Sequence, residues 1–300
     1  MKKIILPIVF IILCASCFQK KLNKPFSYSN FTLPPGTVKM NENLFVDAQE
    51  IRNVDYLEFM QWTKQLFSPE SEDYKKILPD TNVWIKDRKF YNNPYTVYYL
   101  RHPAYHNHPV VGINYEQAQA FCKWRTDRVM EYYLIKNGVL SNSPNPTKEN
   151  YFTIERYFNG KFGKVNDDIY LNYYPQYSLI DTSLYLKIVP FADSLNKEKL
   201  KHSFHKKDKE KKLEIWCRGR DIKPNNYDIT RPVSLMKPEK IIFIENIKGN
   251  VRELTSDKNL SFGGSFFDSC DTIMKTNFYK NTEPNWYTGF RCKCSYIKWK

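Results

Sequence analysis

Residues 245–257 read ENIKGNVRELTSD, residues 262–266 read FGGSF and residues 288–292 read TGFRC. An apolar run at residues 241–244 (IIFI) directly precedes them. Before that run, residues 213–220 (LEIWCRGR) are expected to be ordered again after a long insertion. Each stretch alone is too short to be specific. Their order and spacing are what predict the fold.

Two segments in the N-terminal half extend this pattern. Residues 50–56 read EIRNVDY and lead into a predicted helix with Asn53 as its N-cap. Residues 109–118 read PVVGINYEQA and open a second predicted helix, from about residue 117 to 134. Residues 37–45 are predicted to form a strand, and both amphipathic helices are expected to pack on a sheet. The inward-facing candidates are Val54, Leu57, Phe59 or Met60, and Trp62 in the first helix, and Ala118, Phe121, Cys122, Trp124 and Val129 in the second.

In this order, the segments resemble the signatures of the formylglycine-generating, or sulfatase-modifying-factor, family. The three C-terminal stretches are similar to its GNVWEW, GGS and GFRC motifs. Residues 50–56 are similar to E-V-T-N-x-x-Y, residues 109–118 to PVVxVSWxDA, and residues 213–219 to EWEYACRG. The resemblance covers residues 36–300. It implies an α+β fold, the irregular C-type-lectin-like domain of formylglycine-generating enzymes, with residues 138–212 as a long insertion.

The positions of the family's catalytic cysteines hold other residues here. Family enzymes are similar in having two cysteines after GGS, which bind copper and pass electrons to dioxygen while a substrate cysteine becomes formylglycine. Asp268 and Ile273 stand at these positions, and a carboxylate and an alkyl group cannot form a thiolate copper site. We therefore expect no catalytic residue and no copper. Cys270 either replaces one thiol after a loop rearrangement or is a structural half-cystine.

The resemblance also implies a calcium site. The coordinating groups of the family map to the Asn246 side chain, the carbonyls of Gly249 and Val251, and the Glu253 carboxylate. All are oxygen donors, but calcium takes about 6–8 oxygens, so they supply only part of its shell. The alternative is an ion-free turn in which Glu253 pairs with a nearby cation such as Arg252.

The seven cysteines are consistent with an oxidising compartment. Cys122 and Cys292 match positions that are disulfide-linked in the family. Cys217 matches a half-cystine whose partner is either Cys270 or Cys294. No CxxC pair occurs in the sequence, so a zinc site or a thioredoxin-like motif is not expected.

The N-terminus resembles a bacterial lipoprotein signal. Two lysines precede an apolar run, residues 4–15, that is too short to span a bilayer and ends in LCASC. This resemblance implies a signal peptide at residues 1–16, a lipid on Cys17, a tether at residues 17–35 and a domain at residues 36–300. The lipid would hold the mature chain on a membrane of the cell envelope, expected to be the outer membrane. Simple secretion and an uncleaved anchor are the alternatives.

Composition excludes some functions. The net charge of +14 allows anionic partners without singling out nucleic acid, and none is expected. The chain contains only 10 glycines and neither a GxGxxG nor a GxxxxGK[ST] motif, which argues against a phosphate-binding loop. The lysine-rich residues 197–212 are either a solvated arm or a patch for an anionic glycan or lipid headgroup.

A histidine-rich string is a further candidate for chemistry. His102, His106 and His108 form an HxxxHxH pattern similar to non-haem iron sites of sulfoxide-synthase relatives. Pro103 within the string and Pro109 directly after it break a helix there, so one helical face does not hold His102 and His106 together. An aromatic-rich surface loop is the alternative to a metal site.

These features predict a membrane-anchored lipoprotein with a pseudoenzyme domain that acts as a binding or scaffold module for a protein or a glycan. Similar lipoproteins occur in gliding-motility and secretion machineries, which extends the expectation to those roles. One alternative is a divergent metal-dependent oxidase that uses Cys270 or the three histidines. The other is a calcium-dependent carbohydrate-binding module.

Overall fold

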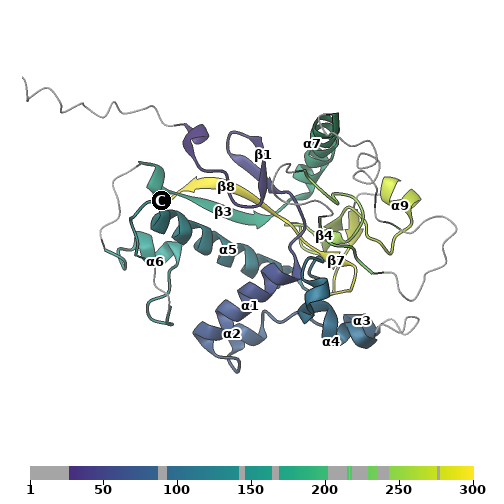
Figure 1. Ribbon diagram of the computed structural model, residues 1–300, viewed down its shortest axis with the longest axis horizontal. Helices are drawn as coiled ribbons and strands as arrows, with labels where there is room; N and C mark the ends of the chain where they lie inside the picture. The colour runs from purple at the N-terminus through teal and green to yellow at the C-terminus, as the bar shows by residue number, and fades with distance from the viewer. Residues whose placement is uncertain are drawn as a thin grey trace, which may run out of the picture.

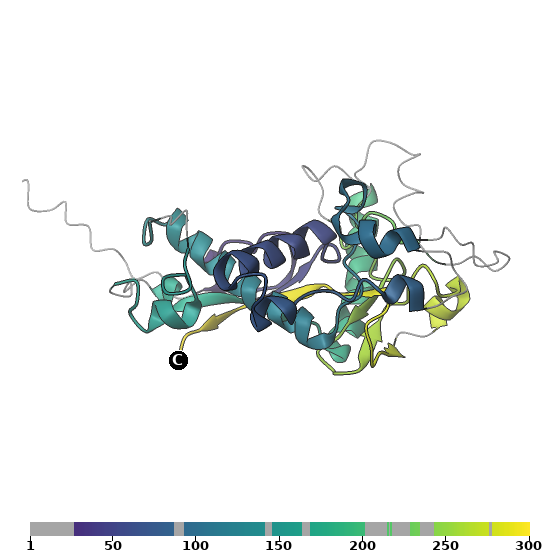
Figure 2. The ribbon, with the colours of Figure 1, turned by 90° about the horizontal axis from the view of Figure 1, so that it is seen from below.

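The computed structural model is a mixed α+β structure with two four-stranded sheets. It describes residues 27–86, 93–141, 146–163, 169–201, 215, 217, 229–234, 243–275 and 278–300. The two sheets lie one after the other along the long axis of the molecule (Figures 1 and 2). The predicted α+β class is therefore confirmed.

The first sheet is antiparallel and has the strand order β1–β2–β8–β3. The prediction of a single strand over residues 37–45 is wrong, because the Asn41 side chain accepts a hydrogen bond from the Asn43 N–H and the chain turns there. The last strand of the chain lies inside the sheet, next to its first hairpin. The four strands are β1 (Thr37–Asn41), β2 (Leu44–Asp47), β8 (Cys292–Lys298) and β3 (Tyr173–Leu179).

The second predicted helix is α5 (Tyr115–Lys136), which packs along β3. It extends two residues beyond the predicted range of 117–134 at each end. Asn114 caps its start, because the Asn114 side chain accepts from the Gln117 N–H while the Gln117 side chain accepts from the Asn114 N–H. Its predicted inward residues Ala118, Phe121, Cys122 and Trp124 are buried, and Val129 is partly buried.

The first predicted helix is α1 (Asn53–Phe67), and its predicted cap is wrong. Arg52 holds the N-cap position. The Asn53 side chain is buried and donates hydrogen bonds to the carbonyls of Tyr99 and Tyr105. Among the inward candidates Phe59 and Met60 are buried, while Val54, Leu57 and Trp62 are partly buried.

The second sheet contains the three C-terminal stretches and has the order β6–β5–β4–β7. Its β4–β7 pair is parallel and its other pairs are antiparallel. Gly289 is required in this sheet, because a Cβ there would lie 2.6 Å from the Val110 carbonyl oxygen. A parallel bridge between Ile180 and Thr255 joins the two sheets. The strands are β6 (Phe278–Lys280), β5 (Leu260–Phe262), β4 (Arg252–Leu254) and β7 (Thr288–Gly289).

Much of the segment predicted to be an insertion, residues 138–212, forms regular structure and is part of the core. It supplies β3, whose seven residues all pair with β8. It also supplies α7 (Thr182–Lys201), whose buried residues Tyr185 and Ile188 form a core with β5. The further elements of this segment are α6 (Ile154–Phe158) and η3 (Ile169–Asn172). Residues 202–212, most of the lysine-rich run, lie outside the described residues.

The remaining elements are short and lie around these two sheets. The folded part starts before residue 36, because residues of the predicted tether pack on the first sheet: the Phe31 ring stacks on Tyr296 at 4.1 Å. Residues 1–26, with the predicted signal and Cys17, lie outside the described residues. None of the described helices is long and apolar enough to cross a membrane. The short elements are η1 (Tyr28–Asn30), α2 (Glu72–Lys75), α3 (Val83–Lys86), α4 (Asn93–Arg101), η2 (Pro103–Tyr105) and α9 (Cys270–Lys275).

Candidate functional site

Asp268 stands at one of the two positions where the sequence resemblance places a catalytic cysteine, and its carboxylate is fully engaged by protein groups. Arg252 donates to both of its oxygens, with the Nε bond at 2.9 Å, and the N–H and hydroxyl of Ser265 donate at 2.9 and 2.8 Å. The Arg252 guanidinium also lies over the rings of Tyr279 and Tyr287, at 4.0 and 4.8 Å. Both charged side chains are largely buried. The Asp268 carboxylate therefore holds the Arg252 side chain in place.

Ile273, at the other position, is buried on helix α9. It packs directly on Gly264, where an added Cβ would collide with the Ile273 side chain. Gly264 also has a φ of 74°, which favours glycine. An alkyl group thus fills the space where the resemblance places the second thiol.

The structure describes five of the seven cysteines and joins two of them in a disulfide. Cys217 and Cys270 form a disulfide with a Cα–Cα distance of 5.2 Å. Of the two partners predicted for Cys217, the structure selects Cys270. The sulfurs of Cys122 and Cys292 lie 3.4 Å apart in the core without a bond between them, and Cys294 is buried nearby on β8. Cys270 is therefore not a free thiol in this structure.

Glu253, the predicted calcium ligand, is buried in an ion pair with Arg291 of the TGFRC stretch. The Arg291 Nε lies 2.7 and 2.8 Å from the two carboxylate oxygens, and its NH2 lies 2.6 Å from Oε1. The Tyr185 hydroxyl also donates to Oε2, at 2.6 Å. The ion-free alternative paired Glu253 with a nearby cation such as Arg252; in the structure that cation is Arg291, and Arg252 pairs with Asp268.

The Asn246 side chain, another predicted calcium ligand, is also used by the protein. The Asn246 Oδ1 accepts from Arg231, while its Nδ2 donates to Glu50 at 3.0 Å. At the two positions expected to supply carbonyl ligands, the Gly249 N–H donates to the Gly263 carbonyl at 3.0 Å and the Val251 side chain is buried. Within the described part of the chain, no three His, Cys, Asp or Glu side chains are grouped so that they could hold a metal ion.

Glu50 is a buried carboxylate that sequence reasoning missed. Its two oxygens accept hydrogen bonds from the side chains of Asn246 and Asn250, which belong to the ENIKGN stretch. Burial raises the pKa of Glu50 to about 7, against the opposing effect of Arg291. Glu50 therefore connects the N-terminal EIRNVDY segment to the C-terminal motifs.

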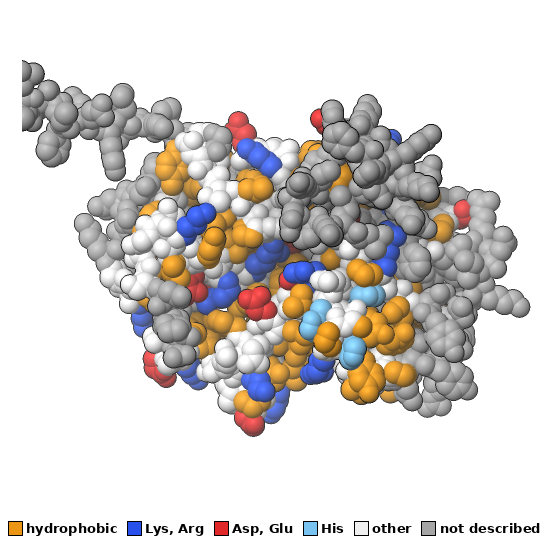
Figure 3. Space-filling model, in the orientation of Figure 1, with side chains coloured by type: hydrophobic (Ala, Val, Ile, Leu, Met, Phe, Trp, Pro, Cys, Tyr) orange, Lys and Arg blue, Asp and Glu red, His pale blue; other side chains and the backbone are white. Residues whose placement is uncertain are grey.

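The three histidines do not converge. His102 accepts from the Ala104 N–H, the His106 ring lies 3.3 Å from the Arg101 carbonyl, and His108 is 2.8 Å from the Thr230 hydroxyl. Burial lowers the pKa of His108 to about 4, so this ring is neutral at physiological pH. Figure 3 shows histidine side chains beside hydrophobic ones on one face. This arrangement agrees with an aromatic-rich surface loop and not with a shared metal site.

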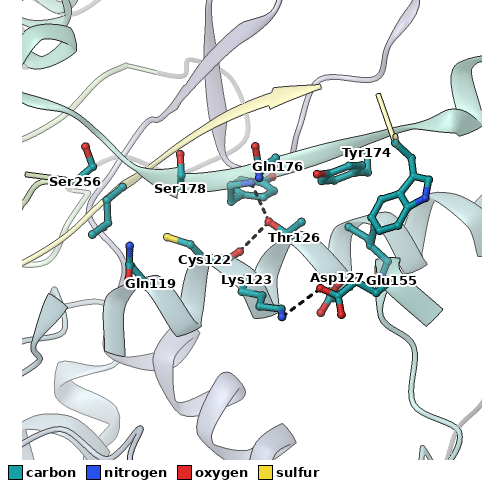
Figure 4. Close-up of a pocket in the computed structure, with 14 residues that line it drawn as sticks. Gln119, Cys122, Lys123, Thr126, Asp127, Glu155, Tyr174, Gln176, Ser178 and Ser256 are labelled. Atoms are coloured by element: carbon teal, nitrogen blue, oxygen red, sulfur yellow. Dashed lines mark hydrogen bonds and ion pairs between the residues drawn. The ribbon is translucent and has the colours of Figure 1, made fainter. Parts of the chain in front are cut away.

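A cavity of about 410 Å³ lies between α5, α6 and the edge strand β3 (Figure 4). Its volume falls within the range of about 300–1,000 Å³ that is typical of small-molecule sites. In the middle of it the Thr126 hydroxyl bridges the two elements, because it donates to the Cys122 carbonyl and accepts from the Tyr177 N–H, both at 2.9 Å. We refer to this cavity as the α5–β3 groove.

Aromatic, neutral polar and charged side chains line the groove. Tyr174 comes from β3 and Trp299 follows β8, and their ring centroids are 6.2 Å apart. Sequence reasoning missed this site, since Tyr174 falls in the predicted insertion and Trp299 is the penultimate residue. The polar lining residues are Gln119, Lys123, Thr126, Asp127, Glu155, Gln176, Ser178 and Ser256.

A second cleft, of about 460 Å³, lies on another face of α5, between α1 and β2. Two ion pairs lie in it: Arg125 binds Asp47 at 2.8 Å, and Arg52 binds Asp55 at 2.7 Å. The α5–β3 groove is therefore the better candidate for binding a ligand, because several of its polar side chains have no partner in the described protein.

Comparison with known proteins does not assign a family. No protein-family model matches the sequence, and no curated protein matches it. A solved structure titled "Crystal Structure of CarF" aligns with 84% of this chain and 86% of its own, at 12% identity and a TM-score of 0.35. A similarity of this size supports no conclusion on function.

Proposed function

We propose that this chain is a non-catalytic relative of the formylglycine-generating family with the irregular C-type-lectin-like domain of that family. It acts as a binding or scaffold module on the outer membrane, held by a lipid on Cys17. Gliding motility and secretion are the processes that this role would serve. The proposal extends the sequence resemblance, and the geometry around Asp268 supports it.

The ion pair between Asp268 and Arg252 is the observation that carries the proposal. A copper-thiolate oxidase needs two sulfurs in this place. Here one position holds a carboxylate neutralised by arginine, and the other holds Ile273 packed on Gly264. Cys270, the nearest thiol in sequence, is bonded to Cys217. This arrangement favours a scaffold over an oxidase.

The other candidate functions have less support. A metal-dependent oxidase built on the histidines would need rings that converge, but each of the three rings contacts a different group. A calcium-dependent module would need Glu253 as a ligand, but its carboxylate faces Arg291. No observation in the described residues favours either candidate.

Copper binding by the purified mature chain tests the proposal. We expect no stoichiometric copper binding and no oxidation of a cysteine-containing sulfatase peptide in the presence of copper and dioxygen. The Cys270→Ser variant shows whether Cys270 is a ligand of any copper that binds. Copper bound at one equivalent and lost in Cys270→Ser, or peptide cysteine converted to an aldehyde, would refute the scaffold assignment.

A further inference from the structure

The aromatic walls of the α5–β3 groove are rigid. The Trp299 ring stacks on Phe158 at 4.8 Å with an interplanar angle of 7°, so a neighbouring ring fixes its orientation. Tyr174 lies at 63° to the Trp299 ring. Both residues are half-buried and line the groove. Two preorganised ring surfaces meeting at an angle suit a ligand with flat apolar faces, because little side-chain entropy is lost on binding.

The charges in the groove disfavour an anionic ligand. Lys123 is the cation among the lining residues, and its Nζ lies 3.5 Å from the Glu155 carboxylate. Asp127 adds a largely buried carboxylate, and burial raises its pKa to about 6. At neutral pH the groove therefore has no excess of positive charge to attract a phosphate, sulfate or carboxylate.

The unused hydrogen-bonding groups of the groove are mostly neutral. Within the described part of the chain, the side chains of Gln176, Ser178 and Ser256 have no hydrogen-bond partner. Asp127 uses Oδ1 to accept from the Ile154 N–H at 3.0 Å, and no described group donates to its Oδ2. Amides, hydroxyls and one carboxylate oxygen complement a ligand that has many hydroxyl groups.

The edge of β3 is poorly suited to a peptide strand. Tyr177 directs its N–H away from β8, but the Thr126 hydroxyl already accepts it. Pro175, two residues earlier and therefore on the same edge, has no N–H. A peptide that added to this edge would find neither donor, so strand addition is disfavoured.

We infer that the α5–β3 groove binds a neutral saccharide, with its apolar ring face on Trp299 and Tyr174 and its hydroxyl groups on Gln176, Ser178 and Asp127. This inference deepens the proposed function and rests on it, since it names the ligand class of the binding module. It uses none of the residues assigned to calcium by the sequence resemblance. Binding in the groove is therefore independent of calcium.

Calorimetric titration of the mature chain with disaccharides tests the inference. The neutral probes are cellobiose, maltose and N,N′-diacetylchitobiose, and the anionic probe is a sulfated heparin disaccharide. We expect at least one neutral probe to bind equally well in calcium and in EDTA, and the anionic probe to bind more weakly. Trp299→Ala and Tyr174→Ala should each weaken binding by about tenfold or more, whereas the exposed aromatic control Tyr98→Ala on α4 should not.

A conservative variant keeps the test independent of folding. Asp127→Asn retains an oxygen for the Ile154 N–H, so the helix start is preserved while the acceptor for ligand hydroxyls is weakened. We expect it to lower affinity several-fold with an unchanged circular dichroism spectrum. The inference is overturned if no neutral probe binds, if the heparin disaccharide binds more tightly, or if binding persists in both Trp299→Ala and Asp127→Asn.

The proposed function and this inference fail separately. Copper-dependent oxidase activity in the mature chain would remove the scaffold assignment without affecting saccharide titrations. A failed titration in a chain that binds no copper would leave the scaffold assignment in place and reject only the saccharide.

Discussion

Arg291 is the most deeply buried charged side chain described here, and three different segments satisfy it. Besides Glu253, it donates to the backbone carbonyls of Asp47 and Glu245. Both members of the ion pair have almost no exposed surface. Removing one partner of such a pair leaves an uncompensated charge in the interior.

We therefore predict that Arg291→Ala lowers the free energy of unfolding by about 3–5 kcal/mol. The matched control is Lys258→Ala, which removes an exposed ion pair with Glu116 and should change stability by less than about 1 kcal/mol. Urea denaturation of the three proteins at pH 7 measures both effects. Equal stability of Arg291→Ala and the wild type would show that the buried pair contributes nothing.

Glu50 should make stability depend on pH. Because its folded pKa of about 7 is higher than its usual value of 4.5, the folded state holds the proton more tightly than the unfolded chain. The protonated Glu50 contributes fully to the free energy of unfolding below pH 4.5. This contribution is lost as the pH rises towards 7, and the free energy of unfolding falls by up to about 3 kcal/mol. Glu50→Gln should remove this loss.

Denaturation curves between pH 4.5 and 8 measure the difference between the wild type and Glu50→Gln. Asp127→Asn is the matched control, because the Asp127 pKa of about 6 limits its contribution to a lower pH range. The same pH slope in wild type and Glu50→Gln would mean that Glu50 stays ionised in the folded state.

At the scale of single residues, the sequence predicted that Asp268 and Ile273 cannot form a thiol pair. It did not predict their partners. Arg252 lies 16 residues from Asp268, and Arg291 lies 38 residues from Glu253. Such pairs are fixed by strand pairing, which brings distant charges into the same buried layer, and no local pattern in the sequence records that choice.

At the scale of elements, one side-chain hydroxyl on α5 forms a hydrogen bond to the backbone of β3. Thr126 satisfies the Tyr177 N–H, a backbone donor that faces away from β8. We predict that Thr126→Val destabilises the protein by about 1–3 kcal/mol, because a buried donor is left without a partner.

Thr63→Val in α1 is the matched control for Thr126→Val. Thr63 is also a buried helical threonine, but its hydroxyl only donates to the Phe59 carbonyl, four residues earlier in the same helix. That substitution should cost less than about 1 kcal/mol. Thermal and urea denaturation compare the two variants, and similar losses for both would contradict a special role of Thr126.

The sequence predicted α1 and α5 well, and it missed α7 and β3. An amphipathic helix shows its buried face within a few turns of its own sequence, as residues 117–134 do. The β3 sequence YYPQYSL contains a proline and polar residues, because one edge of the strand meets α5 and its alternate residues are exposed. Its partner β8 lies more than 110 residues away, so pairing could not be read locally.

At the scale of the whole molecule, a second disulfide would link helix α5 to strand β8. The Cys122 and Cys292 sulfurs are 3.4 Å apart and belong to residues separated by 170 positions. The family resemblance implies that this pair is oxidised. We predict that protein secreted into an oxidising compartment contains a Cys122–Cys292 bond in addition to the Cys217–Cys270 bond. Peptide mapping of the unreduced protein should find both links.

Loss of this bond should be costly, because a closed loop of this length restricts the unfolded chain. Cys122→Ala is expected to lower stability by several kcal/mol, of the order of 5. Cys294→Ala is the control, since Cys294 is buried in the same core and is expected to stay reduced. Free thiols at both Cys122 and Cys292 in the mature protein would contradict the pairing.

The membrane anchor is tested on the intact precursor. We predict that Cys17→Ser abolishes incorporation of labelled palmitate and shifts the protein from the membrane fraction to the soluble fraction. Cys14→Ser is the matched control, since Cys14 belongs to the removed signal peptide in the lipoprotein interpretation. Unchanged labelling of Cys17→Ser would refute lipidation at this residue.

The sequence by itself determined the α+β class, the two amphipathic helices and the absence of two thiols at Asp268 and Ile273, because each depends on residue type or on short-range periodicity. Only the tertiary structure decided that Arg252 neutralises Asp268, that Arg291 neutralises Glu253, and that Trp299 meets Tyr174 across a groove. These outcomes depend on which strands pair over long separations in the chain. Burial then determines which charged side chains pair and which side chains line the cavity, since an unpaired charge in the interior is too costly to persist.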